Sequence, residues 1–269
     1  MEIIVEVLEE TIMMLPMLFF MYFVLEYLER HQLDIFDKIK DLGPLYGAIL
    51  GIIPQCGISV VVSLLFLEGK VSIGTLISVY IATSDEAIPL LLASPESYST
   101  TIYIIVLKLI LGVLFGYLID LFVKSKIDKT SITYHHNEHS LMKCVIERTM
   151  KVYVFIIVVH ILLSYLFDFI GQKQLSVLLL NQSMLQPVIS SIFGLIPHCV
   201  VSIVLSQLYT QQLLSFASLI SGLMTNGGMG LIVLVQNKVG IKIIGKIIGL
   251  LLICSIITGI FLTIICKYI

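Results

Sequence analysis

Two short segments of this very apolar chain place a proline, a polar side chain and a cysteine in a row. They are Pro54–Gln55–Cys56 and, 143 residues later, Pro197–His198–Cys199. A proline within a helix frees the carbonyl one turn earlier, so each segment would offer a carbonyl oxygen beside a thiol. Carbonyls, thiols, an amide and an imidazole together suit a transition-metal cation. The alternative is a pair of structural kinks with buried, inert cysteines and a core histidine.

A second candidate site is acidic and lies in the segment "ATSDEAIP". Asp85 and Glu86 follow Thr83 within the third apolar block of the chain. A carboxylate near the centre of a bilayer costs about 2.5–3.5 kcal/mol on insertion scales, so two together favour a cation site or a proton relay. Alternatively, the apolar block ends at Ala82 and both acids lie at the water interface.

The matching segment of the second half of the chain reads "LMTNGGMGLI". Asn226 stands at the position of Thr83, and glycines replace Ser84 and Asp85. One half therefore supplies acids, and the other supplies an amide and bare backbone. The glycines would serve either access for a ligand or close packing of helices.

Other polar side chains could assist such a site. Lys108 could hold a carboxylate when no metal is bound, although a lysine in an apolar block more often extends to the interface, which we expect for Lys108 and Lys246. A polar stretch between the two halves contains His135, His136 and His139. Short histidine-rich tracts can capture metal loosely, and a solvated linker is the alternative.

The composition indicates an integral membrane protein. Of 269 residues, 58% are apolar and only 13% are charged. A net charge of −2 and only two arginines argue against nucleic acid as a partner. The five cysteines lack paired spacing, so we expect reduced thiols. Without a P-loop sequence, transport driven by a gradient is favoured, and no cofactor is expected.

The chain contains an internal duplication. Four apolar blocks occupy each half, at 12–28, 43–67, 71–93 and 100–123, and at 152–170, 185–209, 213–235 and 239–265. Segments 44–66 and 187–209 align without a gap and are identical at ten of 23 positions, among them two prolines, a glycine, a cysteine and two serines. We predict a first membrane repeat at 1–123, a linker at 124–151 and a second repeat at 152–269.

The basic residues predict how the repeats are oriented. Lysines and an arginine of the central loop place that loop in the cytoplasm, and the acidic N-terminus lies outside. Each half then crosses the membrane an odd number of times, so the repeats are inverted, as in many secondary transporters. The predicted fold is all-α and polytopic, with broken or re-entrant helices at the proline and acidic segments, which would line a cavity.

The duplicated "PQC" and "PHC" elements, the acidic "TSDEAIP" and the histidine-bearing loop resemble the ten-helix heavy-metal exporters. Members of this family are variously labelled manganese transporters or arsenic-efflux permeases. The resemblance implies export of a metal or metalloid across the bacterial inner membrane. The positions that it implicates are Pro54, Gln55, Cys56, Asp85, Glu86, Pro197, His198, Cys199 and Asn226.

The choice of substrate depends on the acids. Trivalent arsenic prefers three thiolates, whereas carboxylates favour a divalent cation, manganese first. We expect alternating access around a midplane site, with proton exchange at the carboxylates.

The alternatives are an arsenite or organoarsenical permease and an intramembrane phosphatase acting on polyprenyl pyrophosphate. The phosphatase would need cationic clamps, which are absent near Pro54 and Pro197. An enzyme is therefore not expected. The expected partners are the metal cation and membrane lipid, and homodimerisation stays open.

Overall fold

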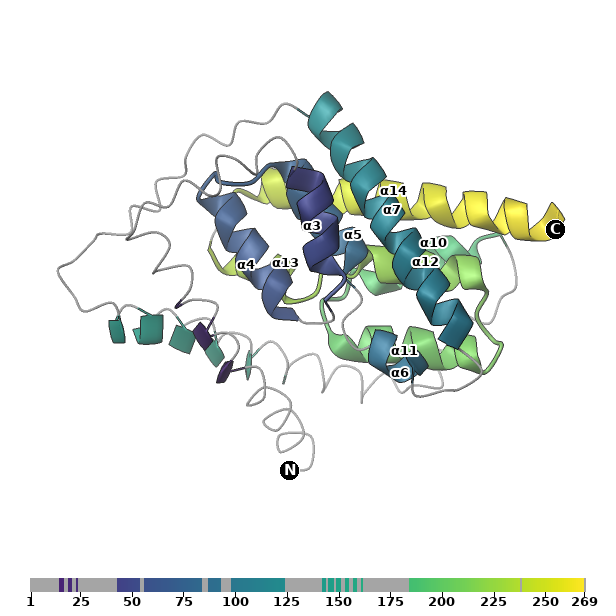
Figure 1. Ribbon diagram of the computed structural model, residues 1–269, viewed down its shortest axis with the longest axis horizontal. Coiled ribbons are helices and arrows are strands. Elements are labelled where there is room, and N and C mark those ends of the chain that lie inside the picture. Colours follow the sequence, from purple (N-terminus) through teal and green to yellow (C-terminus); the bar gives the residue numbers. More distant parts are fainter. Residues whose placement is uncertain are drawn as a thin grey trace.

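The computed structural model is entirely helical in the residues that it describes (Figure 1). These are 43–53, 56–83, 87–92, 98–123, 184–237 and 239–268, with short stretches between 15 and 23 and between 142 and 161. The helices are α3 (Gly43–Gly51), α4 (Cys56–Leu67), α5 (Ile73–Ala82), α6 (Ala87–Leu92), α7 (Tyr98–Phe122), α10 (Gln186–Gly194), α11 (Cys199–Thr210), α12 (Phe216–Thr225), α13 (Met229–Gln236) and α14 (Ile241–Tyr268). The prediction of an all-α fold is confirmed for the described residues.

Three helical segments of the described residues are long and apolar enough to cross a membrane. They are Tyr98–Phe122, Phe216–Gln236 and Ile241–Cys266. About 20 apolar residues are needed for such a crossing. The most apolar window of Phe216–Gln236 is 94% buried, against 28% and 33% for the other two. Phe216–Gln236 therefore lies inside the molecule, while α7 and α14 carry large exposed apolar side chains of the kind that face lipid.

The duplication of the sequence extends to the helix bounds. Helices α10, α11 and α12 begin and end 143 residues after α3, α4 and α5. Their caps correspond as well, because the hydroxyls of Ser72 and Ser215 accept hydrogen bonds from the backbone nitrogens of Thr75 and Ser218. The predicted breaks in the proline and acidic segments both occur, with α3 and α4 separate helices and α5 and α6 likewise.

Small residues bring the helices of the first repeat close together. A Cβ atom on Gly47 would lie 2.9 Å from the carbonyl oxygen of Thr75, and one on Gly51 would lie 2.8 Å from that of Val79. Because later residues of α3 meet later residues of α5, these two helices run parallel, and α4 must return the chain between them. Helix α7 runs antiparallel to α5, with Gly112 against the carbonyl of Ser78.

The second repeat packs its equivalent helices through hydroxyl groups. Ser191 of α10, Ser221 of α12 and Ser255 of α14 share hydrogen bonds, with Ser191 Oγ 2.5 Å from Ser221 Oγ and 2.6 Å from Ser255 Oγ. Small and hydroxyl-bearing residues are the usual means of close helix packing within membranes. The same three-helix unit is thus built twice with different side chains.

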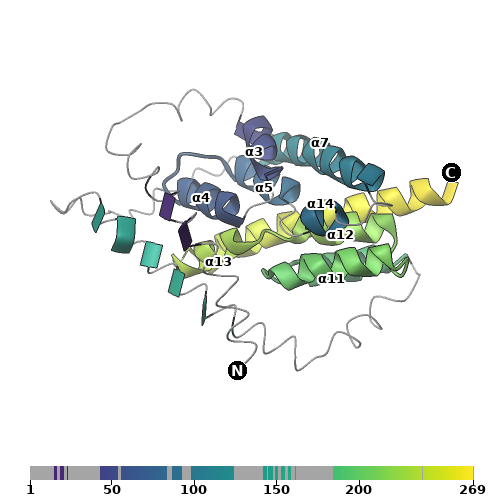
Figure 2. The ribbon, with the colours of Figure 1, turned by 60° about the horizontal axis from the view of Figure 1, so that its bottom comes forward.

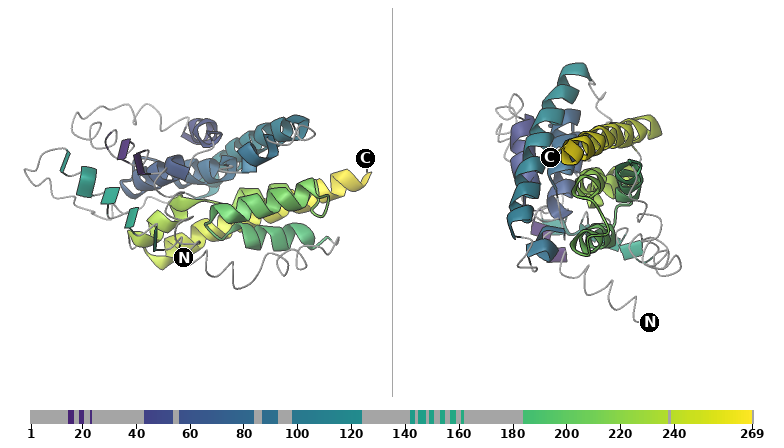
Figure 3. Two further views of the ribbon diagram at one scale, coloured as in Figure 1. Left: turned by 90° about the horizontal axis from the view of Figure 1, so that it is seen from below. Right: turned by 90° about the vertical axis from the view of Figure 1, so that its right-hand side faces the viewer.

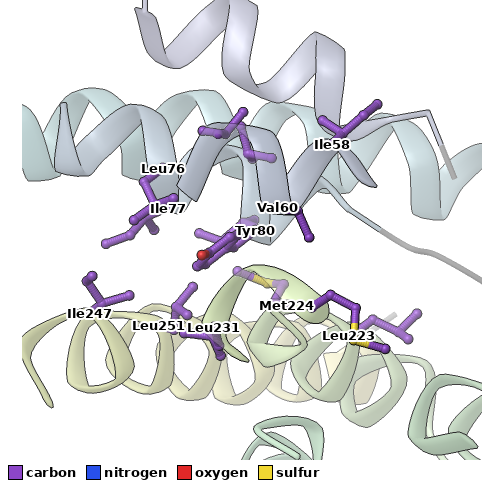
Figure 4. Packing of buried hydrophobic residues seen from close by; sticks show 14 of the residues in the cluster. Ile58, Val60, Leu76, Ile77, Tyr80, Leu223, Met224, Leu231, Ile247 and Leu251 are labelled. Atoms are coloured by element: carbon purple, nitrogen blue, oxygen red, sulfur yellow. The ribbon is translucent and has the colours of Figure 1, made fainter. Parts of the chain in front are cut away.

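The two repeats form adjacent layers and exchange helices at their ends. Figure 3 (left) shows the helices of the first repeat, in blue and teal, above those of the second, in green and yellow. Helix α4 packs against α13, and α11 packs against α6. Figure 2 shows α4 and α13 at the end of the molecule away from the C-terminus. In Figure 4, Tyr80 of α5 points from one layer toward Met224 and Leu231 of the other.

Candidate functional site

The described residues on either side of the break between α5 and α6 are buried. Helix α5 ends at Ala82, Thr83 is its C-cap, and α6 begins at Ala87. Thr83 and Ala87 are 2% and 0% exposed. Asp85 and Glu86 themselves lie outside the described residues.

The break between α12 and α13 is shaped by Asn226. Its amide nitrogen donates to the hydroxyl of Ser202 at 2.7 Å, and its oxygen accepts from the backbone nitrogen of Gly228 at 3.1 Å. Gly228 has φ +55° and ψ −149°, a conformation that is essentially confined to glycine. Asn226 is 4% exposed, so its amide holds the break together from within the protein.

The glycines of this break allow the two repeats to approach closely. A Cβ atom on Gly227 would lie 3.1 Å from Tyr80 Cδ2. One on Gly230 would lie 2.6 Å from the hydroxyl of Ser63 and 2.7 Å from Tyr80 Cε1. Gly227, which stands opposite Ser84, and Gly230 in the first turn of α13 therefore both lie where the helices of the two repeats pack closely.

Lys108 joins the two breaks. This residue of α7 is fully buried, and its Nζ donates to the carbonyl oxygens of Thr83, at 2.5 Å, and Leu223, at 3.1 Å. Thr83 caps the C-terminal end of α5, and Leu223 lies in the last turn of α12. The expectation that Lys108 extends to the interface was wrong, because these carbonyls bind its ammonium inside the protein. Lys246, by contrast, is exposed.

The C-terminal ends of α5 and α12 meet at Lys108, and we call this place the junction. Its electrostatics favour positive charge. The last carbonyls of a helix have no partner within the helix, and the helix dipole adds about half a negative charge at that end. Two such ends, one from each repeat, meet at the Lys108 ammonium. A charged donor also forms stronger hydrogen bonds than a neutral one. The junction is therefore a cation-binding environment built from backbone oxygens.

His198 is the N-cap of α11, the helix that begins directly after the Pro197 segment. Its Nδ1 accepts a hydrogen bond from the backbone nitrogen of Val200 at 3.1 Å, and the residue is 2% exposed. An imidazole that accepts at Nδ1 carries its proton on Nε2 when neutral, so Nε2 faces its surroundings as a donor. In this conformation His198 acts as a helix cap through Nδ1.

The remaining predicted residues are only partly placed. Cys56 and Cys199 are the first residues of α4 and α11, and Pro197 is half-buried directly before α11. The side chains of both cysteines lie outside the description, as do Pro54, Gln55, His135, His136 and His139. Within the described part of the chain, no three His, Cys, Asp or Glu side chains gather as a metal cluster would require.

The sequence did not identify Ser63 and Tyr80 as residues at the contact between the two repeats. Their hydroxyls lie 2.6 Å apart, and both residues are completely buried. Ser63 carried a signal, because it is among the identical positions of the repeat, opposite Ser206. Tyr80 carried none, since its counterpart in the second repeat is Leu223.

Comparison with known families agrees with this picture. Residues 10–169, more than half of the chain, match the model of a family described as "Putative, 10TM heavy-metal exporter". No curated protein and no solved structure matches the chain. The match includes the acidic segment, the first proline segment and Lys108. Together with the apolar helices of membrane-spanning length, it shows that the chain belongs to this family of multi-pass heavy-metal exporters.

Proposed function

We propose that the chain exports a divalent transition-metal cation, manganese first, across the bacterial inner membrane by alternating access. One observation carries the proposal: the C-terminal ends of the broken helices α5 and α12 converge on a buried positive charge, the Lys108 ammonium. Unwound carbonyls and half-helix C-terminal ends are the groups that hold cations in many secondary transporters. A metal cation would bind at this junction.

The residues that we propose as metal ligands come from four segments of the chain. Asp85 and Glu86 follow Thr83 by two and three residues and would neutralise the cation. Gln55 and the Asn226 oxygen would add neutral oxygen ligands, and Cys56 and Cys199, at the starts of α4 and α11, would add softer ones. Hard oxygens with one or two sulfurs suit Mn²⁺ or Fe²⁺, whereas more sulfur would favour Zn²⁺ or Cd²⁺.

The proposed transport cycle uses two inverted repeats, 1–123 and 152–269, joined by a cytoplasmic linker at 124–151, with the N-terminus outside. The correspondence of helix bounds supports the duplication, and the inverted orientation rests on the distribution of basic residues in the sequence. Rocking of one repeat against the other would open the junction to each side in turn. Protons would return through the carboxylates, and His135, His136 and His139 would gather metal on the cytoplasmic side.

Two rival functions make different demands on the same residues. An arsenite permease would depend on thiols rather than on Asp85. A phosphatase would need its cationic groups free to meet phosphate and backbone N–H groups aimed at it. The Lys108 ammonium instead points at carbonyl oxygens, which would repel an anion. This geometry favours a cation over a phosphate ester.

The test is metal uptake into proteoliposomes that contain the purified protein, with Mn²⁺, Zn²⁺, Cd²⁺ and arsenite compared. We expect Mn²⁺ flux in the wild type and its loss in Asp85→Asn, because the site would lose the charge that neutralises the cation. Cys56→Ser should retain most of the flux. Arsenite flux that survives Asp85→Asn and disappears in Cys56→Ser would instead make the protein an arsenic permease. No flux of any of these ions would contradict the proposal.

A further inference from the structure

Among the described residues, the Lys108 ammonium is shared by the C-terminal ends of α5 and α12. Its position in the second repeat is occupied by Leu251, which is also fully buried. The duplication therefore supplies two carbonyl-rich helix ends but a single lysine at these two equivalent positions. Burying a lysine at the centre of a membrane protein is costly, so a lysine found there is expected to serve the function of the site.

We propose that the Lys108 ammonium is a tethered substitute for the transported cation. It occupies the carbonyl oxygens of Thr83 and Leu223 while the site holds no metal, and it leaves them when the metal enters. The inference rests on the proposed function, because it assigns a competitor to the same site. Backbone carbonyls that accept from an ammonium are also ligands for a hard metal cation. Two positive charges cannot share this position, since their repulsion inside the protein is large.

The same contacts connect metal entry to movement of the repeats. Lys108 is anchored on α7 of the first repeat, and its ammonium bridges the end of α5 to the end of α12 in the second repeat. Withdrawal of the ammonium removes a bridge between the repeats, and the metal replaces it with ligands of its own. An empty junction without lysine or metal would leave buried carbonyls unpaired, which is unfavourable. The Lys108 ammonium would thus let the transporter return to its metal-accepting orientation without a bound metal.

The test is equilibrium binding of Mn²⁺ to the purified full-length protein in detergent, with Lys108→Met and Lys108→Arg compared with the wild type. Lys108→Met keeps an apolar side chain of similar length and removes the competitor, so Mn²⁺ should bind about tenfold more tightly or better. Lys108→Arg keeps the charge and should bind Mn²⁺ more weakly than the wild type. Lys246→Met, which removes an exposed lysine of α14, is the matched control and should bind as the wild type does.

Thermal unfolding separates competition from a merely structural role. Without metal, Lys108→Met should unfold at a lower temperature than the wild type because two carbonyls lose their donor. Saturating Mn²⁺ should raise its unfolding temperature by more than it raises that of the wild type. Equal or weaker Mn²⁺ binding by folded Lys108→Met would overturn the inference and leave the proposed function standing. No Mn²⁺ binding by either protein would overturn both.

Discussion

Tyr80 is one of the side chains through which the two repeats meet. Its hydroxyl pairs with that of Ser63 on α4, and its ring edge lies where Cβ atoms on Gly227 and Gly230 would be. Two glycines thus leave room for one aromatic ring from the other repeat. Gly227 stands opposite Ser84 and Gly230 opposite Ala87 of the first repeat, so the second repeat has glycine at both positions that approach the ring.

The close contact at Gly230 gives a prediction for stability. Gly230→Ala would place a methyl group 2.6 Å from Ser63 Oγ and 2.7 Å from the carbonyl oxygen of Ser59, so we expect a loss of about 1–3 kcal/mol. The matched control is Gly249→Ala in α14, where nothing lies within 4 Å of the added Cβ and helix propensity should make the change neutral or stabilising. Thermal unfolding in detergent measures both. Equal stability of the two variants would contradict the packing described for α13.

Residue-scale roles were only partly predictable from the sequence. The acidic segment and the duplicated proline segments stood out because proline and carboxylate residues are costly in apolar blocks. Lys108 was misjudged, although Gly112 and Gly116 follow it on the same face of α7, where small residues are a sign of close helix packing. The partners of Lys108 come from α5 and from α12, 115 residues farther along the chain, and such contacts depend on tertiary packing.

At the scale of elements, α5 and α12 begin with matching serine N-caps, but different side chains contact those caps. The hydroxyls of Ser72 and Ser215 each accept from the backbone nitrogen three residues later, at 3.0 and 3.2 Å. Ser72 also donates to the carboxylate of Asp120 on α7 at 2.6 Å, and Asp120 accepts from the backbone nitrogen of Gly74 at 2.8 Å. In the second repeat Thr263 takes the position of Asp120, so α12 lacks this carboxylate.

This difference predicts unequal effects of the same substitution. Ser72→Ala and Ser215→Ala should each cost about 0.5–2 kcal/mol through loss of the N-cap. Ser72→Ala should cost more, since it also removes a hydrogen bond to a charged carboxylate near the N-terminal end of α5. The measurement is the unfolding temperature of the two variants in the same detergent. A larger loss for Ser215→Ala would mean that Asp120 does not support α5 in this way.

The helix breaks were the most predictable elements, and their bounds agree with the sequence repeat. The exchange of α4 and α11 between the repeats was not predictable. Both helices are strongly apolar, and an apolar block in a membrane protein fits lipid and protein neighbours equally well. Only the buried serines, Ser59 and Ser63 on α4 and their counterparts Ser202 and Ser206 on α11, mark the faces that turn inward.

At the scale of the whole molecule, two layers enclose an interior in which both broken helices end. Helices α7 and α14 cover it and present apolar side chains outward, whereas α12 and α13 are almost entirely enclosed. Enclosure raises the strength of every electrostatic interaction at the junction, because water does not screen it there. The fold thereby brings carbonyl-rich helix ends of opposite repeats together at a place shielded from lipid.

The most direct test of this account is to locate bound metal in the whole protein. Crystals of the full-length protein soaked in Mn²⁺ should show an anomalous diffraction peak at the junction of the α5 and α12 ends, with the Lys108 ammonium withdrawn from the carbonyls of Thr83 and Leu223. A peak in the linker that holds His135, or one coordinated by cysteines alone, with the Lys108 contacts intact, would contradict it.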